Sequence, residues 1–535
     1  MKGEGKVVFE VAPEGVDEET LALELETRLG VVEGRRAARR VTFYDTFDWR
    51  LWRAKRRLEA VRGGDRARAT LILSDPGGTP LRRLPSAPAP SFASVLPEGP
   101  LRAILEPLTA GRRLLPRAEL RCRRRVWRLV DGQGKTLLRV FLDRCEVSSP
   151  GRPDSLPLPA LLRLEPVRGY TEARRRALAE LKRIPGLERR EGDELTSVLA
   201  VLGRRPADYS SKIDLHLEPE TRADVAMKQV HRALLDAVRS NEDGTRRDLD
   251  PEFLHDLRVA VRRARTVLGQ VKEVFPEQVV ERFRRELAWL GQVTGPTRDL
   301  DVYRLKLQGY RRELAGAASD LDGLGEYLER HRSEEQARLA KVLVGARYQR
   351  LVNAWQSFVD RPVPAHSGLA HAERPIVEVA AGRIHKVWKR VVARGRAIDA
   401  ASPAEELHRL RIDCKKLRYL LEIFRSLFAA DEVAALVRSL KQLQDCLGDY
   451  NDYEVQQEML GVFARGMAEE GSAPVPTLLA MGRLVERLSQ AQAAERERFE
   501  KRFRRFADDA NHRRFKELFG AKAVARRLEV PGSGG

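Results

Sequence analysis

The sequence predicts two domains of different class, an α+β domain at the N-terminus and an all-α domain after it. Up to about residue 206, short apolar runs of strand length alternate with turn signals. From about residue 220 to about residue 528, long amphipathic helical patterns with few prolines replace them. At 535 residues, of which 42% are hydrophobic, the chain has enough apolar material for more than one core.

In the N-terminal half, apolar runs bounded by turn residues predict strands. They lie at residues 7–11, 69–73, 124–130 and 137–142. The last two runs flank the turn Asp131-Gly132-Gln133-Gly134 and predict a β-hairpin. Helical patterns lie near residues 18–29 and 171–183, whereas the proline-rich residues 84–90 predict a loop.

The helical half is predicted to form antiparallel bundles joined by short connections. Helix-breaking residues divide the pattern at residues 241–244, 276, 295–296, 361–364, 402–403 and 471–474. The glycine-rich end of the chain predicts a loose tail over residues 529–535.

The chain is strongly basic, with 98 lysines and arginines against 78 aspartates and glutamates and a net charge of +20. Such a surface attracts polyanions, namely nucleic acids, polyphosphate or acidic membranes. Aromatic residues are only 6% of the chain, which leaves little material for stacking bases. The sequence contains no helix-turn-helix, zinc-finger or RNA-motif signature, so a specific nucleic-acid partner is not expected.

The sequence also indicates the cellular compartment in which the protein is expected. The N-terminal residues MKGEGKVVFEV hold no apolar segment typical of a signal peptide, and no run of about 18 apolar residues predicts a membrane span. The four cysteines form no CxxC pair, and a disulfide framework is not expected in so long a chain. We therefore expect a cytoplasmic protein, and no motif calls for a cofactor.

The helical half repeats part of its own sequence. The segment from His255 to Arg265 matches the segment from His408 to Arg418 at an offset of 153 residues. The same offset still holds some forty residues later, where it relates Leu290 to Leu443, Gly295 to Gly448, Asp299 to Asp452 and Val302 to Val455. A further pair, His231 and His385, recurs at an offset of 154 residues, which we attribute to slippage in loops. This pattern predicts a duplicated helical bundle.

On a helical wheel of about 100° per residue, each copy separates into an apolar face and a basic stripe headed by histidine. Arg263 and Lys416 lie at the edges of these stripes. The first stripe contains His255, Arg258, Arg262 and Arg265, and the second contains His408, Arg411, Lys415 and Arg418.

Two interpretations of these stripes compete. A charged helix face is usually only solvated, and a single histidine is often a capping or core residue. Like charges three or four residues apart, however, cost a helix roughly a few tenths of a kcal/mol per pair, so their duplication favours an anion that relieves the repulsion. A polyanion would also raise the pKa of the histidines. A metal site is not predicted, because neither His255 nor His408 has a second His or Cys at helical ligand spacing.

The two stripes, together with Arg298-Asp299-Leu300-Asp301-Val302 and Leu447-Gly448-Asp449-Tyr450-Asn451-Asp452, resemble the CHAD family, the conserved-histidine α-helical domain. The resemblance spans about residues 215–515, with repeats at about 220–360 and 374–515, and implies two four-helix bundles related by pseudo-twofold symmetry. It also implies binding of inorganic polyphosphate and association with polyphosphate granules. The residues expected to line the binding surface are His231, His255, Arg258, Arg262, Arg263, Arg265, His385, Lys389, His408, Arg411, Lys415, Lys416 and Arg418.

Residues 1–206 resemble a CYTH or triphosphate-tunnel domain, which is an antiparallel β barrel or tunnel. The matching stretches are residues 43–51, 119–127 and 142–143. Active members carry an ExExK strand whose carboxylates hold the catalytic metal. The equivalent strand here reads Lys6-Val7-Val8-Phe9-Glu10, so the resemblance implies a degenerate domain without that metal site and without hydrolase activity.

Three functions remain open at this point. Non-enzymatic polyphosphate binding agrees with the basic stripes. A triphosphatase or polyphosphatase would need the N-terminal domain, whose missing glutamates argue against it. Generic binding of polyanions, nucleic acid included, follows from net charge alone. The arginine run at residues 121–125 either binds anions or forms an ordinary hairpin surface.

Overall fold

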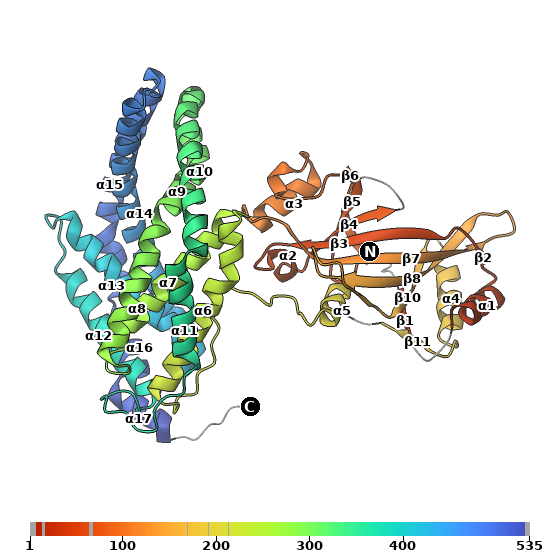
Figure 1. Cartoon of the computed structure of the whole chain (residues 1–535), viewed down its shortest axis with the longest axis horizontal. Helices are drawn as coiled ribbons and strands as arrows, with labels where there is room; N and C mark the ends of the chain where they lie inside the picture. Colours follow the sequence, from red (N-terminus) through yellow and green to blue (C-terminus); the bar gives the residue numbers. More distant parts are fainter. Residues whose placement is uncertain are drawn as a thin grey trace. The chain divides into compact units, whose positions relative to one another are not determined.

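The computed structural model describes residues 7–12, 17–63, 68–167, 170–190, 192–211 and 213–529. The chain divides into two compact units, Met1–Ser211 and Lys212–Gly535 (Figure 1). The first unit is built on an antiparallel sheet and the second is all helical, which confirms the predicted fold class. Among the described residues, no helix is both long enough and apolar enough to span a membrane.

The N-terminal unit contains one antiparallel sheet, whose described strands follow the order β11-β1-β10-β8-β7-β3-β4-β5-β6, with β2 paired to β7 and β9 to β8. Side chains alternate between the two faces of the sheet along every strand, and a cavity lies on one of these faces. The strands are β1 Val7–Val11, β2 Val32–Glu33, β3 Ala37–Asp45, β4 Arg57–Gly63, β5 Ala69–Ser74, β6 Pro80–Ala87, β7 Leu115–Val130, β8 Thr136–Ser148, β9 Ser155–Pro157, β10 Ala160–Pro166 and β11 Leu187–Arg189.

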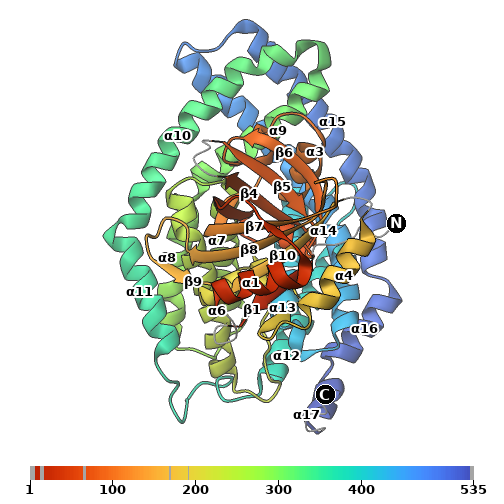
Figure 2. The ribbon, with the colours of Figure 1, turned by 90° about the vertical axis from the view of Figure 1, so that its right-hand side faces the viewer.

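Helices cover both faces of this sheet. On one face α1 (Glu18–Leu29) and α4 (Thr171–Leu181) pack against the sheet (Figure 2), and Trp127 of β7 is buried in the core that they form with it. On the other face α5 (Glu194–Val201) packs against Leu120 of β7. The short helices α2 (Arg50–Arg53), η1 (Ala93–Val95) and α3 (Pro100–Thr109) lie near the β3–β6 end.

The hairpin predicted from the turn at residues 131–134 is confirmed as β7 and β8. Its register places Cys122 directly opposite Cys145, and the two form a disulfide. The expectation that the chain has no disulfide is therefore wrong. The cysteines are 23 residues apart in sequence, and only the length of the β7–β8 ladder brings them together. Cysteine usage consequently no longer argues for a reducing compartment.

The loop predicted at residues 84–90 is wrong at its start, because β6 continues to Ala87. β6 is the last strand of the sheet, and an edge strand tolerates a proline because one side of it needs no ladder hydrogen bonds. The register shifts opposite Pro85 and Ser86, and Ser86 has a φ of 53°. A local bulge therefore accommodates the residues that predicted a loop.

The second unit contains only helices in its described part. Their bounds agree with most of the predicted breaks, since helices end or begin at residues 276, 295–296, 361–364, 402–403 and 471–474. They are α6 Ala223–Arg246, α7 Pro251–Gln270, α8 Glu277–Val293, α9 Gly295–Leu314, η2 Ala315–Leu321, α10 Asp322–Val344, α11 Ala346–Asp360, α12 Ile376–Arg396, α13 Ala404–Ile423, η3 Arg425–Leu427, α14 Ala430–Glu469, α15 Val475–Phe506, α16 Asp509–Phe519 and α17 Ala521–Glu529.

The break predicted at residues 241–244 is wrong, because α6 runs through them to Arg246. A Cβ at Gly244 would overlap the ring of Phe253 on α7, so the glycine allows the two helices to pack closely rather than ending α6. The C-terminal tail predicted for residues 529–535 lies outside the described residues, apart from Glu529 at the end of α17.

The sequence repeat is a structural repeat. Four helices of the first copy begin 153 residues before their counterparts: α6 and α12, α7 and α13, α8 and α14, α10 and α15. In the second copy α14 is a single helix of 40 residues, whereas the first copy divides the same stretch into α8 and α9. Pro296 at the start of α9 causes this division, because proline cannot donate a helical hydrogen bond.

The two copies share their interior. One core cluster contains residues of both, including Leu257 of α7 and Leu410 of α13. A second core joins α9 and α10 to α14 and α15, with Leu307 and Leu484 among its members. In Figure 1 helices of this second core extend at one end of the unit. The repeats are therefore packed into one body, and equivalent faces of α7 and α13 come together.

Candidate functional site

The two basic stripes meet where α7 packs against α13. Arg263 of α7 donates a hydrogen bond of 2.9 Å to Glu422 of α13. The guanidinium groups of Arg262, Arg263 and Arg418 all lie 5.7–5.8 Å from the ring centre of Tyr419. Arginines of both repeats therefore gather around one aromatic ring of the second repeat, within the range of cation–π attraction.

We call His255, Arg258, Arg262, Arg411, Lys415 and Arg418 the basic cluster. Burial, together with the positive charges of Arg411 and Arg262, lowers the pKa of Lys415 to about 8. Burial and the charge of Arg262 also lower the pKa of Arg411, against the opposing effect of Asp452. Because Arg262 belongs to the first repeat and Arg411 to the second, the stripes act electrostatically as one surface.

Different contacts orient the two central arginines. Arg258 donates to the carbonyl oxygen of Gly291 at 2.7 Å and to Oγ1 of Thr294 at 2.8 Å. Its counterpart Arg411 donates to Oδ1 of Asp452 at 2.9 Å. The first-copy equivalent of Asp452 is Asp299, whose charge acts on Arg258 without a direct ion pair being formed. Only part of the positive charge is thus balanced by carboxylates.

The two histidines have different surroundings. Burial lowers the pKa of His255, and the charge of Arg298 lowers it further, so the ring is neutral near pH 7 without a ligand. His408 is exposed, and its Nδ1 lies 2.6 Å from Oδ1 of Asn451. Arg298 and Asn451 are equivalent residues of the two copies. Sequence reasoning noticed both within matching motifs but assigned them no role.

Two predicted residues are engaged elsewhere. Lys416 donates a hydrogen bond of 3.2 Å to the buried Asp413, which also pairs with Arg390 and Arg394 of α12. Arg263 is held by Glu422. Arg265 is exposed on the same side of α7 as Arg258, and in the described structure no carboxylate lies within ion-pair distance of it. Arg265 is therefore available to a ligand, whereas Lys416 and Arg263 have anionic partners, as do Arg411 and Arg418 of the basic cluster.

The prediction that His231 lies on the binding surface is wrong. Its side chain is 1% exposed, and Trp355 and Phe358 contact its ring in the core of the first repeat. The equivalent residue of the second copy is the buried Ile384, because the structural offset is 153 and not 154 residues. The apparent pairing of His231 with His385 is thus one position out of register.

The structure does not bring His385 or Lys389 into the basic cluster. The ring of His385 stacks on Trp388 with centroids 5.6 Å apart, and Trp388 contacts His512 and Phe515 of α16. This side of α12 faces α16 rather than α13. We therefore place these two residues outside the candidate site.

Tyr419 is a site residue that sequence reasoning missed. Its side chain is 2% exposed, and its hydroxyl has no hydrogen-bond partner among the described residues. The signal was available, because Tyr419 directly follows the last arginine of the second stripe. Its role depends on the tertiary structure, since two of the arginines around it come from the other repeat.

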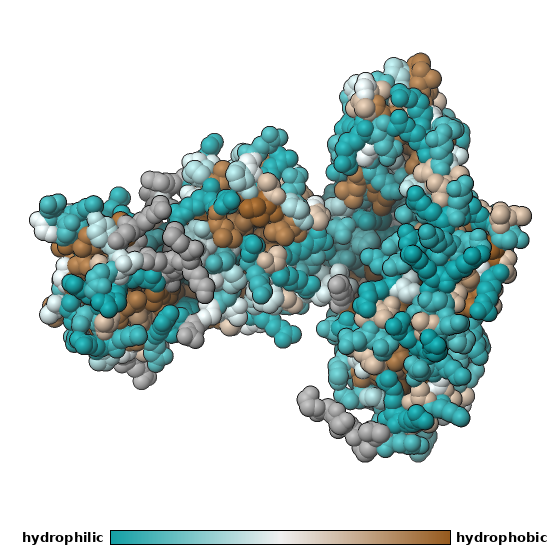
Figure 3. Space-filling model, turned by 180° about the vertical axis from the view of Figure 1, so that it is seen from behind, coloured by the Kyte–Doolittle hydropathy of each residue, from teal (hydrophilic) through white to brown (hydrophobic). Residues whose placement is uncertain are grey.

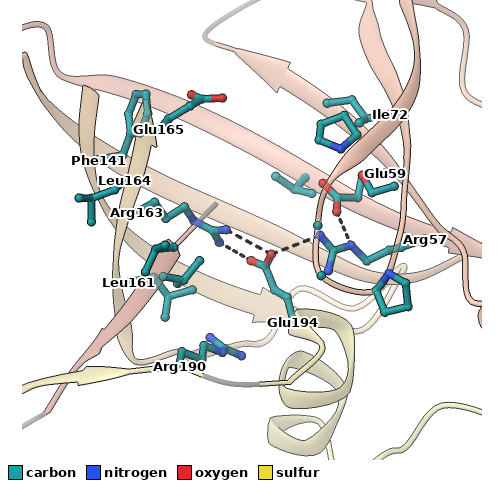
Figure 4. Close-up of a pocket in the computed structure, with 18 of the residues that line it drawn as sticks. Arg57, Glu59, Ile72, Phe141, Leu161, Arg163, Leu164, Glu165, Arg190 and Glu194 are labelled. Carbon is teal, nitrogen blue, oxygen red and sulfur yellow. Dashed lines mark hydrogen bonds and ion pairs between the residues drawn. The ribbon is translucent and has the colours of Figure 1, made fainter. Parts of the chain in front are cut away.

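The N-terminal unit contains a cavity of about 380 Å³ lined by residues that include Arg39, Arg57, Arg163, Glu165 and Glu194. Figure 4 shows Glu194 between Arg163 and Arg57, with Glu165 apart from them. Arg57 also donates to Glu59 at 2.5 Å. The ion pairs to Arg163 outweigh the effect of burial and lower the pKa of Glu194 to about 2.

A second carboxylate of this unit, Asp143, is fully buried among arginines. It accepts hydrogen bonds from Arg124 at 2.6 Å, from Arg163 at 2.9 Å and from Arg39 at 3.2 Å. Although burial favours the protonated acid, these arginines lower the pKa of Asp143. Arginines thus already neutralise Asp143 and, within the cavity, Glu59 and Glu194.

The resemblance of this unit to triphosphate-tunnel domains implies a divalent metal, and the residues present do not fit one. Val8 of β1 lines the cavity where a metal-binding glutamate is expected, and Lys6 lies outside the described residues. Asp143 and Glu194 hold arginines instead of leaving oxygen atoms free. In the described structure no three His, Cys, Asp or Glu side chains are grouped so that they could hold a metal ion.

Comparisons with known proteins match parts of the chain. The CHAD domain family model matches residues 229–461. Two uncharacterised proteins of Mycobacterium tuberculosis, from strains H37Rv and CDC 1551, are 29% identical over 289 residues, which is 50% of this chain and 53% of theirs. The chain thus spans about half the length of the curated relatives it matches.

Solved structures also resemble parts of this chain, with low TM-scores. The CHAD domain from the plant Ricinus communis is 24% identical and covers 55% of this chain and 95% of its own, with a TM-score of 0.46. A putative adenylyl cyclase from Hippeastrum, described as having a dominant triphosphatase activity, is 14% identical and covers 38% of this chain and 99% of its own, with a TM-score of 0.22. The family match includes all of α7 and α13 and therefore the whole basic cluster, so residues 229–461 of this chain form a CHAD domain.

Proposed function

We propose that the CHAD domain binds inorganic polyphosphate, without chemistry, through the basic cluster and Arg265. The observation that supports this most directly is the meeting of two like-charged stripes across the α7–α13 contact. Arg262 and Lys415 occupy equivalent positions, and no carboxylate of the described structure lies within ion-pair distance of either. Holding these cations together without an anion costs energy, which a bound polyanion would relieve.

A phosphate chain suits this surface because each unit carries roughly one negative charge and exposed oxygens all around it. The guanidinium groups would form two parallel hydrogen bonds to phosphate oxygens, whereas Lys415 would act as a point charge. A bound polyanion would also raise the pKa of His255 and favour its protonated form as a further donor. Association with polyphosphate granules is part of the same proposal, since it would follow from the ligand.

The sharpest test reverses one cation in each repeat, with Arg262→Glu combined with Lys415→Glu. Neither side chain has an ion-pair partner in the described structure, and the thermal midpoint Tm of the variant separates loss of binding from unfolding. At about 0.15 M salt we expect the affinity for long-chain polyphosphate to fall about 100-fold, roughly 1.4 kcal/mol per lost contact. Isothermal titration calorimetry of the full chain would measure it.

The matched control combines Arg338→Glu with Arg504→Glu. These arginines are 67% and 76% exposed, one in each repeat, and make only local ion pairs with Glu335 and Glu500. This control changes the net charge equally and should lower the affinity far less. Equal losses in both variants, or equal displacement of polyphosphate by duplex DNA, would mean that net charge alone attracts polyanions.

A further inference from the structure

The arginine run of β7 separates into three environments. Arg124 points into the cavity and holds Asp143, whereas Arg125 is buried against Glu33 and Glu18. Arg121 and Arg123 are exposed on the opposite face from Arg124. The sequence alone could not decide whether this run binds anions, and the structure shows that only Arg121 and Arg123 are available outside.

Arginines of neighbouring strands join these two. Arg62 of β4 lies directly opposite Arg40 of β3, and Arg40 lies directly opposite Arg121 of β7. In the adjacent row Arg123 lies directly opposite Arg144 of β8. We call these five residues the arginine face. Neighbouring strands are about 4.8 Å apart, so the five side chains leave the sheet close together.

Little negative charge compensates the arginine face. Arg144 pairs with Glu18 at 2.9 Å, and Glu18 is shared with Arg125. The other four arginines have no carboxylate within ion-pair distance among the described residues, and all five are exposed. Glu146, opposite Arg121, accepts a hydrogen bond from Ser155 instead. Like charges directly opposite each other destabilise a sheet, so this arrangement has a cost that solvent exposure alone does not explain.

The arginine face is also hollowed. Arg40, Arg121, Arg123 and Arg144 line a groove of about 960 Å³, whose other side is formed by Ala12 and the segment at residues 157–160. None of the residues that line this groove is aromatic, so it offers no ring on which a base could stack. The groove thus combines concentrated guanidinium groups with a shape that an extended chain without bases can occupy.

We propose that the arginine face is a second binding site for inorganic polyphosphate, separate from the basic cluster and located on the outer face of the N-terminal sheet. The proposal rests on the proposed function in one respect, namely that polyphosphate is the ligand of this protein. Guanidinium groups bind phosphate oxygens in pairs of hydrogen bonds, and the rows of arginines would contact several units of one chain. The N-terminal unit then contributes to binding without any hydrolysis in its cavity.

The test uses the full chain with Arg40→Glu combined with Arg123→Glu. Each introduced carboxylate lies opposite a remaining arginine, so the thermal midpoint Tm should stay the same or rise, which separates loss of binding from unfolding. We expect the affinity for long-chain polyphosphate to fall at least about tenfold at 0.15 M salt, and the slope of log K against log salt to decrease by about two. Arg175→Glu with Arg176→Glu is the matched control, since these arginines are 80% and 79% exposed on α4 of the same unit.

Combining Arg40→Glu and Arg123→Glu with Arg262→Glu and Lys415→Glu in one chain distinguishes the two sites. Residual binding of the Arg262→Glu, Lys415→Glu variant that is lost on adding Arg40→Glu and Arg123→Glu would establish the second site. If the arginine-face variant binds like its α4 control while the basic-cluster variant is impaired, this inference is overturned and the proposed function stands. If only the arginine-face variant is impaired, the second site stands and the basic cluster is not the main site. Residual binding that duplex DNA displaces fully at 0.15 M salt would overturn polyphosphate as the ligand of the arginine face.

Discussion

Individual side chains of the helical unit show how one residue type serves different purposes. His255 lies beside Arg298 at the edge of the basic cluster, where a polyanion would favour its protonation. His231 lies among aromatic rings, and burial lowers its pKa to about 4. The first histidine belongs to the candidate site, and the second belongs to the core.

This difference predicts an effect of His231→Leu on acid stability. Between pH 6.5 and about pH 4 the unfolded chain binds a proton at residue 231 that the folded chain does not, so stability is lost as pH falls. The loss amounts to roughly 3 kcal/mol, and the leucine variant should lack it. Urea unfolding at several pH values would measure it, with the exposed His366→Leu as control.

The polyphosphate affinity of the His231→Leu variant provides a second test of where His231 lies. Because the imidazole of His231 is buried away from the basic cluster, His231→Leu should bind polyphosphate like the unmodified chain. A loss of affinity comparable to that of Arg262→Glu with Lys415→Glu would return His231 to the binding surface and contradict its placement in the core.

Close packing of a helix against its neighbour can outweigh the local preference of the sequence for a helix break. The residues Asn241-Glu242-Asp243-Gly244 predict a break, yet α6 continues because Gly244 admits the ring of Phe253 from α7. In the same way the edge position of β6 admits Pro85. The division between α8 and α9, by contrast, follows a local signal, Pro296, which has no counterpart in the continuous α14. Packing of an element against its neighbours therefore overrides some local signals, whereas most helix ends follow them.

Gly244→Ala tests this account of α6. The added methyl group would press on Phe253, and we expect the free energy of unfolding to fall by about 1–3 kcal/mol despite the better helix propensity of alanine. The control is Gly382→Ala on α12, where no atom lies within 4 Å of the added Cβ and stability should rise by up to about 1 kcal/mol. Urea unfolding of both variants measures the difference. Equal stabilisation by the two changes would mean that Gly244 is not a packing residue.

The arginines of the two units differ in which groups they contact. In the helical unit they gather on the outside across the repeat boundary. In the N-terminal unit they neutralise Asp143 and the cavity residue Glu194, so that neither carboxylate is left free for a divalent ion. On the outer face of the same sheet, Arg144 alone among the five residues of the arginine face has a carboxylate partner in the described structure. This distribution favours binding of anions over their hydrolysis.

Incubation with tripolyphosphate and Mg²⁺ or Mn²⁺ tests this division of roles. We expect no phosphate release above the level without metal, and no rise of Tm on adding either ion, because no group of carboxylates in the described cavity is free to bind it. Metal-dependent phosphate release that Arg163→Glu abolishes would show instead that the cavity is catalytic.

Much of the fold was predictable because its signals are local. Turn residues at 131–134 predicted the hairpin, and prolines and glycines predicted most helix ends. The basic stripes were readable because α-helical periodicity places residues three and four apart on one side. The disulfide between Cys122 and Cys145 was missed because it depends on the register of a long ladder, although that register follows from the predicted turn.

By itself the sequence determined the α+β and all-α halves, the 153-residue repeat and a cationic stripe on each of two helices, since these depend on periodicity and composition along the chain. Only the tertiary structure decided that the stripes meet around Tyr419 and that His231 is buried. It also sorted the arginines of β7 between cavity and outer face. The physical reason is that burial and charge pairing depend on which elements pack together, and residues far apart in sequence supply most of those partners.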